Sequence, residues 1–428
     1  ERFFRRGWAG KYVVSCFTCT TLAALTNNLL SMEILRSTRR PGLSRLWRVL
    51  LCASICLVLV VVGLKVRDYK RRQRHLVSKS AIPTLPFQDH YMVPNPKAAK
   101  YVPPSGGGTS FDPSKDVQTY GRFSCVDPLE EPSGISKGQS PINREDISTP
   151  LAKLTSHPNF EMACFKSGDL VCNAIERYGG WDSNLGDALI RAKDYLPEAA
   201  RPFPMTNVMD IGANVGYFGL LAASQGHTVY MFEPMALNRA IVRSSMCMNP
   251  EMAERIMLFP YGLGEHATCT LISHKENVGD GHTKCGTEPP ELSNGYVDRG
   301  KIQVVPLVEV VNEQEKLFFL KIDVEGYELR VMKTARSLLK RGNVAFIYTE
   351  VSVVMMGGRE NVHEYFELLW DSGFEVHIET TDDTRTRVKS TVINGAIVEN
   401  KEDVNVLVTE TGLHNCFCIH RTWRQLRT

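Results

Sequence analysis

Beyond about residue 200, apolar and polar residues alternate in blocks that predict strands separated by helices. Buried-type apolar runs predict strands at residues 208–211, 227–232, 256–263, 317–322 and 344–348, and residues 395–398 and 404–408 are expected to complete the sheet. Between them, apolar residues recur at helical spacing, most clearly over residues 217–224, 236–246 and 361–371. This order requires a mainly parallel sheet with helices on both faces. We therefore predict an α/β, doubly wound, Rossmann-like domain over residues 201–410.

The stretch from Val208 to Pro234 combines a strand, a glycine turn, a helix and a second strand. Asp210 lies near the carboxyl end of the first strand, and Glu233 follows the second. The turn between Gly212 and Gly216 allows positive φ and the close approach of a ligand. Doubly wound sheets bind their ligands beyond the carboxyl ends of the strands. The alternative is a glycine-rich turn of any α/β protein, with no cofactor role.

Two carboxylates on neighbouring strand ends suit S-adenosyl-L-methionine (SAM). Its ammonium group matches a carboxylate near Asp210, and its ribose diol matches Glu233. The glycines at 212, 216 and 219 do not follow the G-x-G-x-x-G spacing of NAD sites. This spacing disfavours an NAD-dependent oxidoreductase.

Two later strands also end on acids, Asp323 and Glu350. A single acid in this position more often caps the following helix, but four in the same register predict a site at one edge of the sheet. Methyl transfer to a hydroxyl needs an oriented acceptor and a group that takes its proton. We expect Asp323 to face the transferred methyl group. Glu325, Glu328 and His282, the last in a predicted polar loop at 275–294, are second candidates, and Glu328 equally fits the first turn of a helix.

Three motifs resemble the signatures of FkbM-type SAM-dependent methyltransferases. They are Asp210-Ile-Gly-Ala-Asn-Val-Gly216, Phe232-Glu-Pro234 and Leu320-Lys-Ile-Asp-Val-Glu-Gly-Tyr-Glu328. The resemblance covers roughly residues 207–354 and continues more weakly to about 378; the third motif is the most specific. It implies a class I methyltransferase fold, SAM as cofactor and, usually, O-methylation of a hydroxyl on a sugar or natural product.

The resemblance also assigns residues. It puts the acceptor side at Asp323 and Glu325, and the cofactor at Asp210, Gly212, Asn214, Gly216 and Glu233. One departure is Pro306-Leu-Val308, where the family commonly has Thr-Leu-Asp before a helix. The missing carboxylate leaves the handling of the acceptor open.

An uninterrupted apolar run extends from Val49 to Leu64. As a helix it spans about 24 Å, and flanking Arg48 and Lys65 can snorkel to reach across a hydrocarbon core of about 30 Å. A cleaved signal peptide is disfavoured because a basic cluster follows the run. We predict a single transmembrane helix at 46–66.

The other segments follow from composition. Residues 1–45 form an N-terminal tail, in which Met32 is a candidate start and 1–31 a candidate artefact of the gene model. A basic and then Pro/Gly-rich stem occupies 67–115. An irregular and helical cap is predicted at 116–200, and a C-terminal tail at 411–428. This layout is that of Golgi type II enzymes with a lumenal catalytic domain, whereas the basic residues slightly favour a cytosolic one, so orientation stays open.

Composition excludes few classes of protein. The formal net charge of +3 is small, and no nucleic-acid-binding surface is expected. The 12 cysteines fit either disulfides in an oxidising lumen or free buried thiols. Their spacing is not that of a zinc site, and no metal site is predicted.

The sequence thus predicts a membrane-anchored SAM-dependent methyltransferase that methylates a hydroxyl on a glycan or other small molecule. A lipid or protein methyltransferase that exploits the anchor is one alternative. A catalytically silent interaction module that keeps the fold is another.

Overall fold

A computed structural model of the protein describes residues 116–119, 121, 123–130, 139, 147–148, 160–192, 206–286, 290, 292, 295–379, 395–407 and 413–424. All of them belong to the second of two compact units, Thr84–Thr428. The predicted N-terminal tail, the anchor at 46–66 and the stem up to residue 115 lie outside the described residues. Among the described helices, none is long and apolar enough to cross a bilayer.

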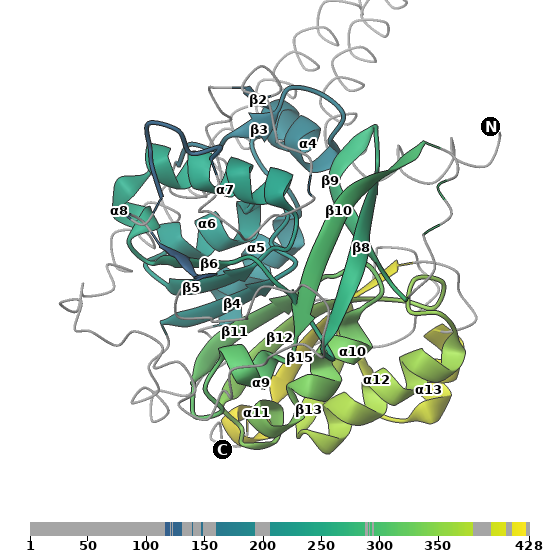
Figure 1. Ribbon diagram of the computed structural model, residues 1–428. Coiled ribbons are helices and arrows are strands. Elements are labelled where there is room, and N and C mark those ends of the chain that lie inside the picture. Colours follow the sequence, from purple (N-terminus) through teal and green to yellow (C-terminus); the bar gives the residue numbers. More distant parts are fainter. Residues whose placement is uncertain are drawn as a thin grey trace, which may run out of the picture. The chain divides into compact units, whose positions relative to one another are not determined.

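The centre of the domain is a nine-stranded mixed sheet (Figure 1). Its strands lie in the order β1 (Gln118–Thr119), β6 (Ile256–Phe259), β5 (Thr228–Phe232), β4 (Asn207–Ile211), β11 (Leu317–Ile322), β12 (Val344–Ser352), β15 (Leu413–His420), β13 (Phe374–Glu379) and β14 (Gly395–Val398). The five strands from β6 to β12 are parallel. In contrast, β1, β15 and β14 run antiparallel to their neighbours. The predicted α/β, mainly parallel sheet is confirmed.

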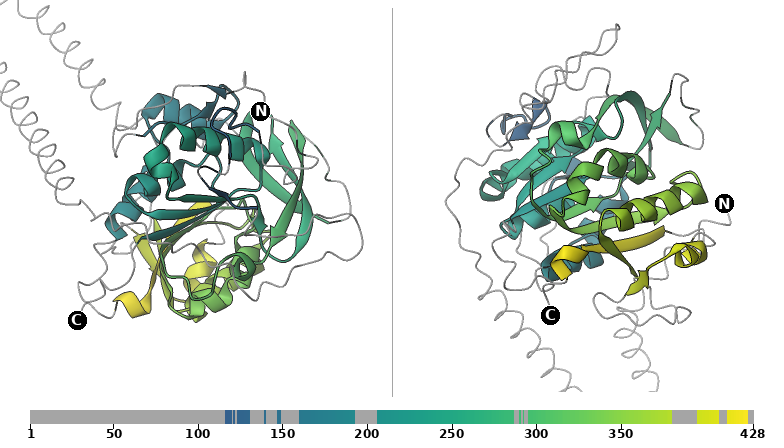
Figure 2. Two further views of the ribbon diagram at one scale, coloured as in Figure 1. Left: turned by 60° about the vertical axis from the view of Figure 1, so that its left-hand side comes forward. Right: turned by 90° about the horizontal axis from the view of Figure 1, so that it is seen from below.

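Helices cover both faces of this sheet (Figures 1 and 2). One layer contains α4 (Leu170–Tyr178), α5 (Ser183–Ala192), α6 (Tyr217–Ser224), α7 (Ala236–Met248) and α8 (Pro250–Ala253). The other contains α9 (Leu307–Val310), α10 (Glu328–Thr334), α11 (Arg336–Lys340), α12 (Arg359–Asp371) and α13 (Lys401–Leu407), and a short α14 (Arg421–Arg424) follows β15. Side chains of a strand point alternately to the two faces. Val208 and Phe319 therefore join the core under α6, whereas Met209 and Leu320 join the core under α10.

A second, four-stranded sheet lies between β6 and α9 in the sequence. Its order is β7 (Gly262–Leu263), β10 (Tyr296–Val305), β8 (Ala267–His274) and β9 (Asn277–Cys285). In Figure 1 its long strands stand beside the edge of the central sheet where β4 and β11 end. A short pair, β2 (Ile147–Ser148) and β3 (Cys164–Phe165), accompanies α4.

Three sequence predictions are wrong. The predicted loop at 275–294 contains β9, which pairs with β8 although it is polar and glycine-rich. Residues 404–408, predicted as a strand, belong largely to α13, because Asn400 Oδ1 accepts a hydrogen bond from the Asp403 N–H and starts a helix there. The predicted tail at 411–428 contains β15, which pairs with β12 and β13. The domain therefore extends beyond residue 410.

The cysteines divide between the two expected states. Cys125 is bonded to Cys247 and Cys269 to Cys285. Four other cysteines in the described part of the chain are buried thiols: Cys164, Cys172, Cys416 and Cys418. The second disulfide joins neighbouring positions on β8 and β9, so it fixes the strand that sequence patterning missed.

Candidate functional site

The glycine turn after β4 presses against the end of β11. Gly212 has a φ of +78°, and a Cβ atom there would lie 1.9 Å from the carbonyl oxygen of Asp323. The N–H groups of Gly212 and Ala213 both donate to the carbonyl of Phe232, each at 3.0 Å. Only glycine satisfies both the backbone angle and the close approach. The turn is thereby held between the ends of β5 and β11.

Gly216 sets the position of the helix that follows the glycine turn. It precedes α6 with a φ of +86°, and a Cβ atom there would meet Val242 Cγ2 of α7 at 2.8 Å. This glycine allows α6 to begin close to α7. It is not one of the residues that line the cleft described below.

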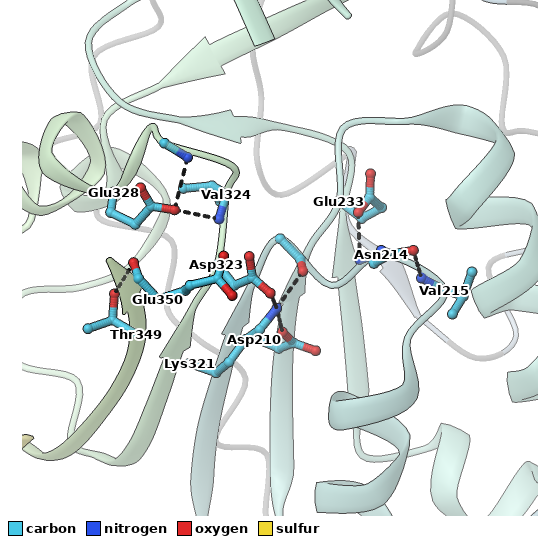
Figure 3. A network of polar contacts seen from close by, with 12 residues as sticks. Asp210, Asn214, Val215, Glu233, Lys321, Asp323, Val324, Glu328, Thr349 and Glu350 are labelled. Carbon is cyan, nitrogen blue, oxygen red and sulfur yellow. Dashed lines mark hydrogen bonds and ion pairs between the residues drawn. The ribbon is translucent and has the colours of Figure 1, made fainter. Parts of the chain in front are cut away.

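Glu233 holds the glycine turn from the end of β5. Its Oε2 accepts the Asn214 N–H at 2.7 Å (Figure 3). Its Oε1 accepts the Met235 N–H at 2.8 Å. Asn214 has a φ of +53°, a left-handed conformation that Asn tolerates better than most residues. Burial raises the pKa of Glu233 to about 7, although the backbone N–H groups of Met235 and Asn214 stabilise the carboxylate and act to lower the pKa. Its Oε1 and Oε2 can each accept more than one hydrogen bond, so the carboxylate keeps capacity for one further donor beside Asn238.

Lys321 of β11 connects two of the predicted acids (Figure 3). Its Nζ lies 3.4 Å from Asp210 Oδ1 and 3.6 Å from Asp323 Oδ2, and it donates to the Gly212 carbonyl at 2.7 Å. Burial lowers the pKa of the Lys321 ammonium, but the carboxylates of Asp323 and Asp210 outweigh this, so the pKa lies above its ordinary value. The lysine is thus charged and links β4, the glycine turn and β11.

The two acids on this lysine differ in accessibility. Asp210 has no exposed surface, and burial raises its pKa despite Lys321. It lies beneath the turn and is not among the residues that line the cleft, so a direct contact between Asp210 and a cofactor ammonium group stays a prediction. Asp323 keeps 40% of its side chain exposed and lines the cleft. Only Asp323 of this pair is placed to act on a bound molecule.

A cleft that is open to solvent at its mouth lies between the central sheet and the four-stranded sheet. One wall carries Gly212, Asn214 and Glu233 from the central sheet, and another carries Gly279, Asp280 and Gly281 from β9. Asp323 and Glu325 complete it. Five of the predicted site residues therefore line one cleft: Gly212, Asn214, Glu233, Asp323 and Glu325.

Strand β9 lies close to the glycine turn at Asn214 because Gly279 has no side chain. A Cβ atom there would lie 2.5 Å from Asn214 Oδ1 and 2.5 Å from Asp169 Oδ2. Asp169, the N-cap of α4, accepts the Gly279 N–H at 2.9 Å, and Asn238 of α7 donates to the Gly279 carbonyl at 2.9 Å. These hydrogen bonds attach α4 and α7 to β9, the strand that forms one wall of the cleft.

The side of the cleft that carries Asp323 and Glu325 is strongly acidic. Burial, with Asp323 and Asp280 nearby, raises the pKa of Glu325 to about 10. Burial, with Asp323 and Glu328, raises the pKa of Glu350 to about 8. Glu328 itself accepts the Val324 N–H at 3.0 Å and the Gly326 N–H at 3.2 Å, so it supports the turn.

His282 does not line the cleft but lies next to a residue that does. Its Nε2 is 3.5 Å from Oδ1 of Asp280, two residues earlier on β9. Sequence analysis missed Asp280 and Lys321. A lysine inside an otherwise apolar strand was the available signal for the latter. Residues 306–308, where the family pattern is broken, are not among those that line the cleft.

The sheet order, the glycine turn and the acids at the strand ends define an α/β protein of the class I methyltransferase type. Residues 210–376 match the family model described as the methyltransferase FkbM domain. The chain therefore carries an FkbM methyltransferase domain, as the three motifs predicted. No match was found among the curated proteins.

Solved structures similar to this one include several methyltransferases. The precorrin-6Y C5,15-methyltransferase of Geobacter metallireducens GS-15 is 9% identical, with a TM-score of 0.26 over 54% of this chain and 86% of that one. The bifunctional kinase-methyltransferase WbdD is 14% identical, with a TM-score of 0.29 over 64% of this chain and 44% of that one. A TehB-like SAM-dependent methyltransferase of Corynebacterium glutamicum is 10% identical, with a TM-score of 0.29 over 58% and 93%.

Proposed function

We propose that the protein is a SAM-dependent O-methyltransferase that acts on a hydroxyl of a glycan or another small molecule. The observation that carries this proposal is the position of Asp323. Its partly exposed carboxylate lies in the cleft between the wall of Asn214 and Glu233 and the acidic side at Glu325. A proton acceptor between a cofactor wall and a second wall is what methyl transfer to a hydroxyl requires.

The residues of the first wall fit SAM. Glu233 has hydrogen-bonding capacity left for the ribose hydroxyls, and it lines the cleft together with Gly212, Asn214 and Gly279. When bound, SAM supplies a methyl group on a sulfonium, and transfer forms a carbon–oxygen bond as the methyl–sulfur bond breaks with its electron pair left on sulfur. Asp323 takes the proton of the acceptor hydroxyl.

Lys321 orients this base. Its ammonium lies 3.6 Å from Asp323 and is itself fixed by Asp210 and the Gly212 carbonyl. The base is therefore attached to the same turn that binds the cofactor, which aligns acceptor and methyl group. A silent interaction module would have no need for this arrangement.

Binding and turnover test the proposal separately. Calorimetry on the purified 428-residue chain should show SAM binding, and Glu233→Gln should weaken it at least tenfold because a charge-assisted acceptor is lost. Glu276→Gln, at the exposed turn between β8 and β9, is the matched control. Incubation with SAM and panels of glycans and hydroxylated metabolites should yield a product with one methyl on oxygen. Tight NAD binding, or methylation of lipid or protein alone, would overturn the proposal.

A membrane-anchored enzyme with its catalytic domain in a secretory lumen is part of the same proposal. Two disulfides in the domain support the lumenal side, because such bonds persist in oxidising compartments. Protease treatment of sealed vesicles should leave the domain intact. Digestion of the domain in sealed vesicles would place it in the cytosol.

A further inference from the structure

Three side chains of different chemistry meet at the edge of the cleft. Asp280 and His282 come from β9, and Glu325 comes from the turn after β11. One ligand atom from each lies within 4.8 Å of the others. Two carboxylate oxygens and one imidazole nitrogen form a mixed donor set. Such a set suits a divalent first-row transition metal better than Mg²⁺ or Ca²⁺, which prefer oxygen alone.

The fold brings these groups together by two independent devices. Asp280 and His282 are two residues apart on one strand, so their side chains lie on the same face of β9. Glu325 has a φ of +55° and precedes Gly326, whose φ is +94° and whose Cβ would meet the Met355 carbonyl at 2.1 Å. The Glu328 carboxylate holds this turn by accepting the N–H of Gly326 (Figure 3).

Neighbouring side chains orient the donors without using all their atoms. Asn277 Nδ2 donates to Oδ2 of Asp280 at 2.9 Å. Oδ1 of Asp280 is buried and accepts no hydrogen bond within the described part of the chain, and His282 Nε2 lies 3.5 Å from it. The His282 ring packs edge-on against Tyr296 with centroids 5.7 Å apart. Oriented donors with a free buried oxygen are typical of a metal site and its supporting residues.

The charges around the cluster favour a cation. Asp280 and Glu325 line the cleft together with Asp323. The nearest ammonium, that of Lys321, is already shared between Asp210 and Asp323. Adjacent carboxylates repel each other unless a proton or a cation lies between them. On the side of Asp280, a neighbouring nitrogen is that of His282, at 3.5 Å.

We propose that Asp280, His282 and Glu325 bind a divalent transition-metal ion, Mn²⁺ or Zn²⁺, whose open coordination positions face the cleft. An acceptor hydroxyl bound there would become more acidic, lose its proton to Asp323 and attack the methyl carbon through its oxygen, while the metal stays unchanged. This role in catalysis rests on the proposed function, but the site itself does not. Sequence spacing does not reveal the site because Glu325, in the turn after β11, is far along the chain from the other two ligands.

Metal binding is measured on the full chain after treatment with a chelator. Titration with Mn²⁺ followed by electron paramagnetic resonance should show one bound ion per chain, and Zn²⁺ should be bound at the same stoichiometry by calorimetry. Asp280→Asn, His282→Gln and Glu325→Gln should each weaken binding at least tenfold. Glu276→Gln removes a carboxylate from the neighbouring turn and should bind as the wild type does. Circular dichroism confirms that each variant is folded.

Binding of neither ion by the wild type, or unchanged binding in all three variants, overturns the proposal. Calorimetry with SAM alone on the same preparations separates this result from the proposed function. SAM binding and methyl transfer without metal binding would refute the metal site only. Stoichiometric Mn²⁺ binding without SAM binding would support the metal site and refute the methyltransferase.

Discussion

Lys321 and Asp210 lie opposite each other on adjacent parallel strands, and the lysine ammonium is 3.4 Å from a carboxylate with no exposed surface. Removing one partner of a buried pair leaves the other charge uncompensated. The Lys321 ammonium also donates a hydrogen bond to the Gly212 carbonyl. Loss of the lysine should therefore affect both the stability of the sheet and the conformation of the glycine turn.

Lys321→Met should therefore lower the free energy of unfolding by about 3–5 kcal/mol, as measured by urea denaturation. Lys333→Met, which breaks the exposed pair with Glu364, should cost at most about 1 kcal/mol. The double variant Lys321→Met, Asp210→Asn should recover part of the loss because no buried charge remains. Equal losses in the single and double variants would show that the charge of Asp210 is not the cause.

Asp323→Asn should lower kcat by about 10²–10⁴ while leaving SAM affinity nearly unchanged. The physical reason is the loss of a proton acceptor that lies in the cleft but outside the wall of Glu233. Helix capping does not explain Asp323, because the N–H groups of Val324 and Gly326 are bound by Glu328 instead. Asp298→Asn, on β10, is the control for an Asp away from the cleft. Wild-type turnover in Asp323→Asn would shift attention to Glu325 and His282.

Glu350→Gln should stabilise the protein increasingly as the pH rises. Burial and the carboxylates of Asp323 and Glu328 raise the pKa of Glu350 to about 8 in the folded state, from an ordinary 4.5. Between these values the folded chain binds a proton that the unfolded chain has lost, so stability falls with rising pH. Glutamine imitates the neutral acid and removes this dependence.

The expected gain in free energy of unfolding for Glu350→Gln is on the order of 1–3 kcal/mol at pH 9 and close to zero at pH 4. Urea denaturation of both proteins at several pH values measures it. A difference that does not change between pH 4 and pH 9 would mean that Glu350 titrates normally in the folded protein.

Gly212→Ala should abolish accumulation of folded protein, because the added methyl would lie 1.9 Å from the Asp323 carbonyl oxygen. Gly121→Ala separates this clash from backbone strain. Gly121 has a φ of +90° and open space around its Cβ position, so its replacement should cost only about 1–2 kcal/mol. Thermal unfolding of both variants is the measurement. Similar melting temperatures in the two variants would show that the end of β11 moves readily to accommodate the added methyl group.

The sequence predicted the centre of the molecule because its signals are local. From Val208 to Pro234, strand, turn and helix each follow from adjacent residues, and the parallel order places Asp323 beside the first strand without further information. Strand β9 was not predicted because Asn277, Gly279 and Gly281 have low strand propensity. Its pairing depends on β8 and on a disulfide to Cys269, neither of which a local pattern reveals.

The candidate site was predicted in part for the same reason. Asn214 and Glu233 are set by one continuous stretch and line the cleft as expected. Asp210 was expected at the ligand, but the strand order places Lys321 against it and buries it. Asp280 was overlooked because a polar loop gives no reason to distinguish one acid from another. The contacts that select these residues join segments far apart in the chain.

Strand β15 has a consequence for the order in which the protein is made. It lies between β12 and β13 in the sheet, although it follows both in the sequence. When β13 leaves the ribosome, its partner has not been synthesised, and the roughly 40 residues up to His420 take about 2–8 s to translate. During that interval the growing chain carries β13 and β14 as an unattached hairpin beside an open edge of β12, a surface that chaperones recognise and that other nascent chains can join.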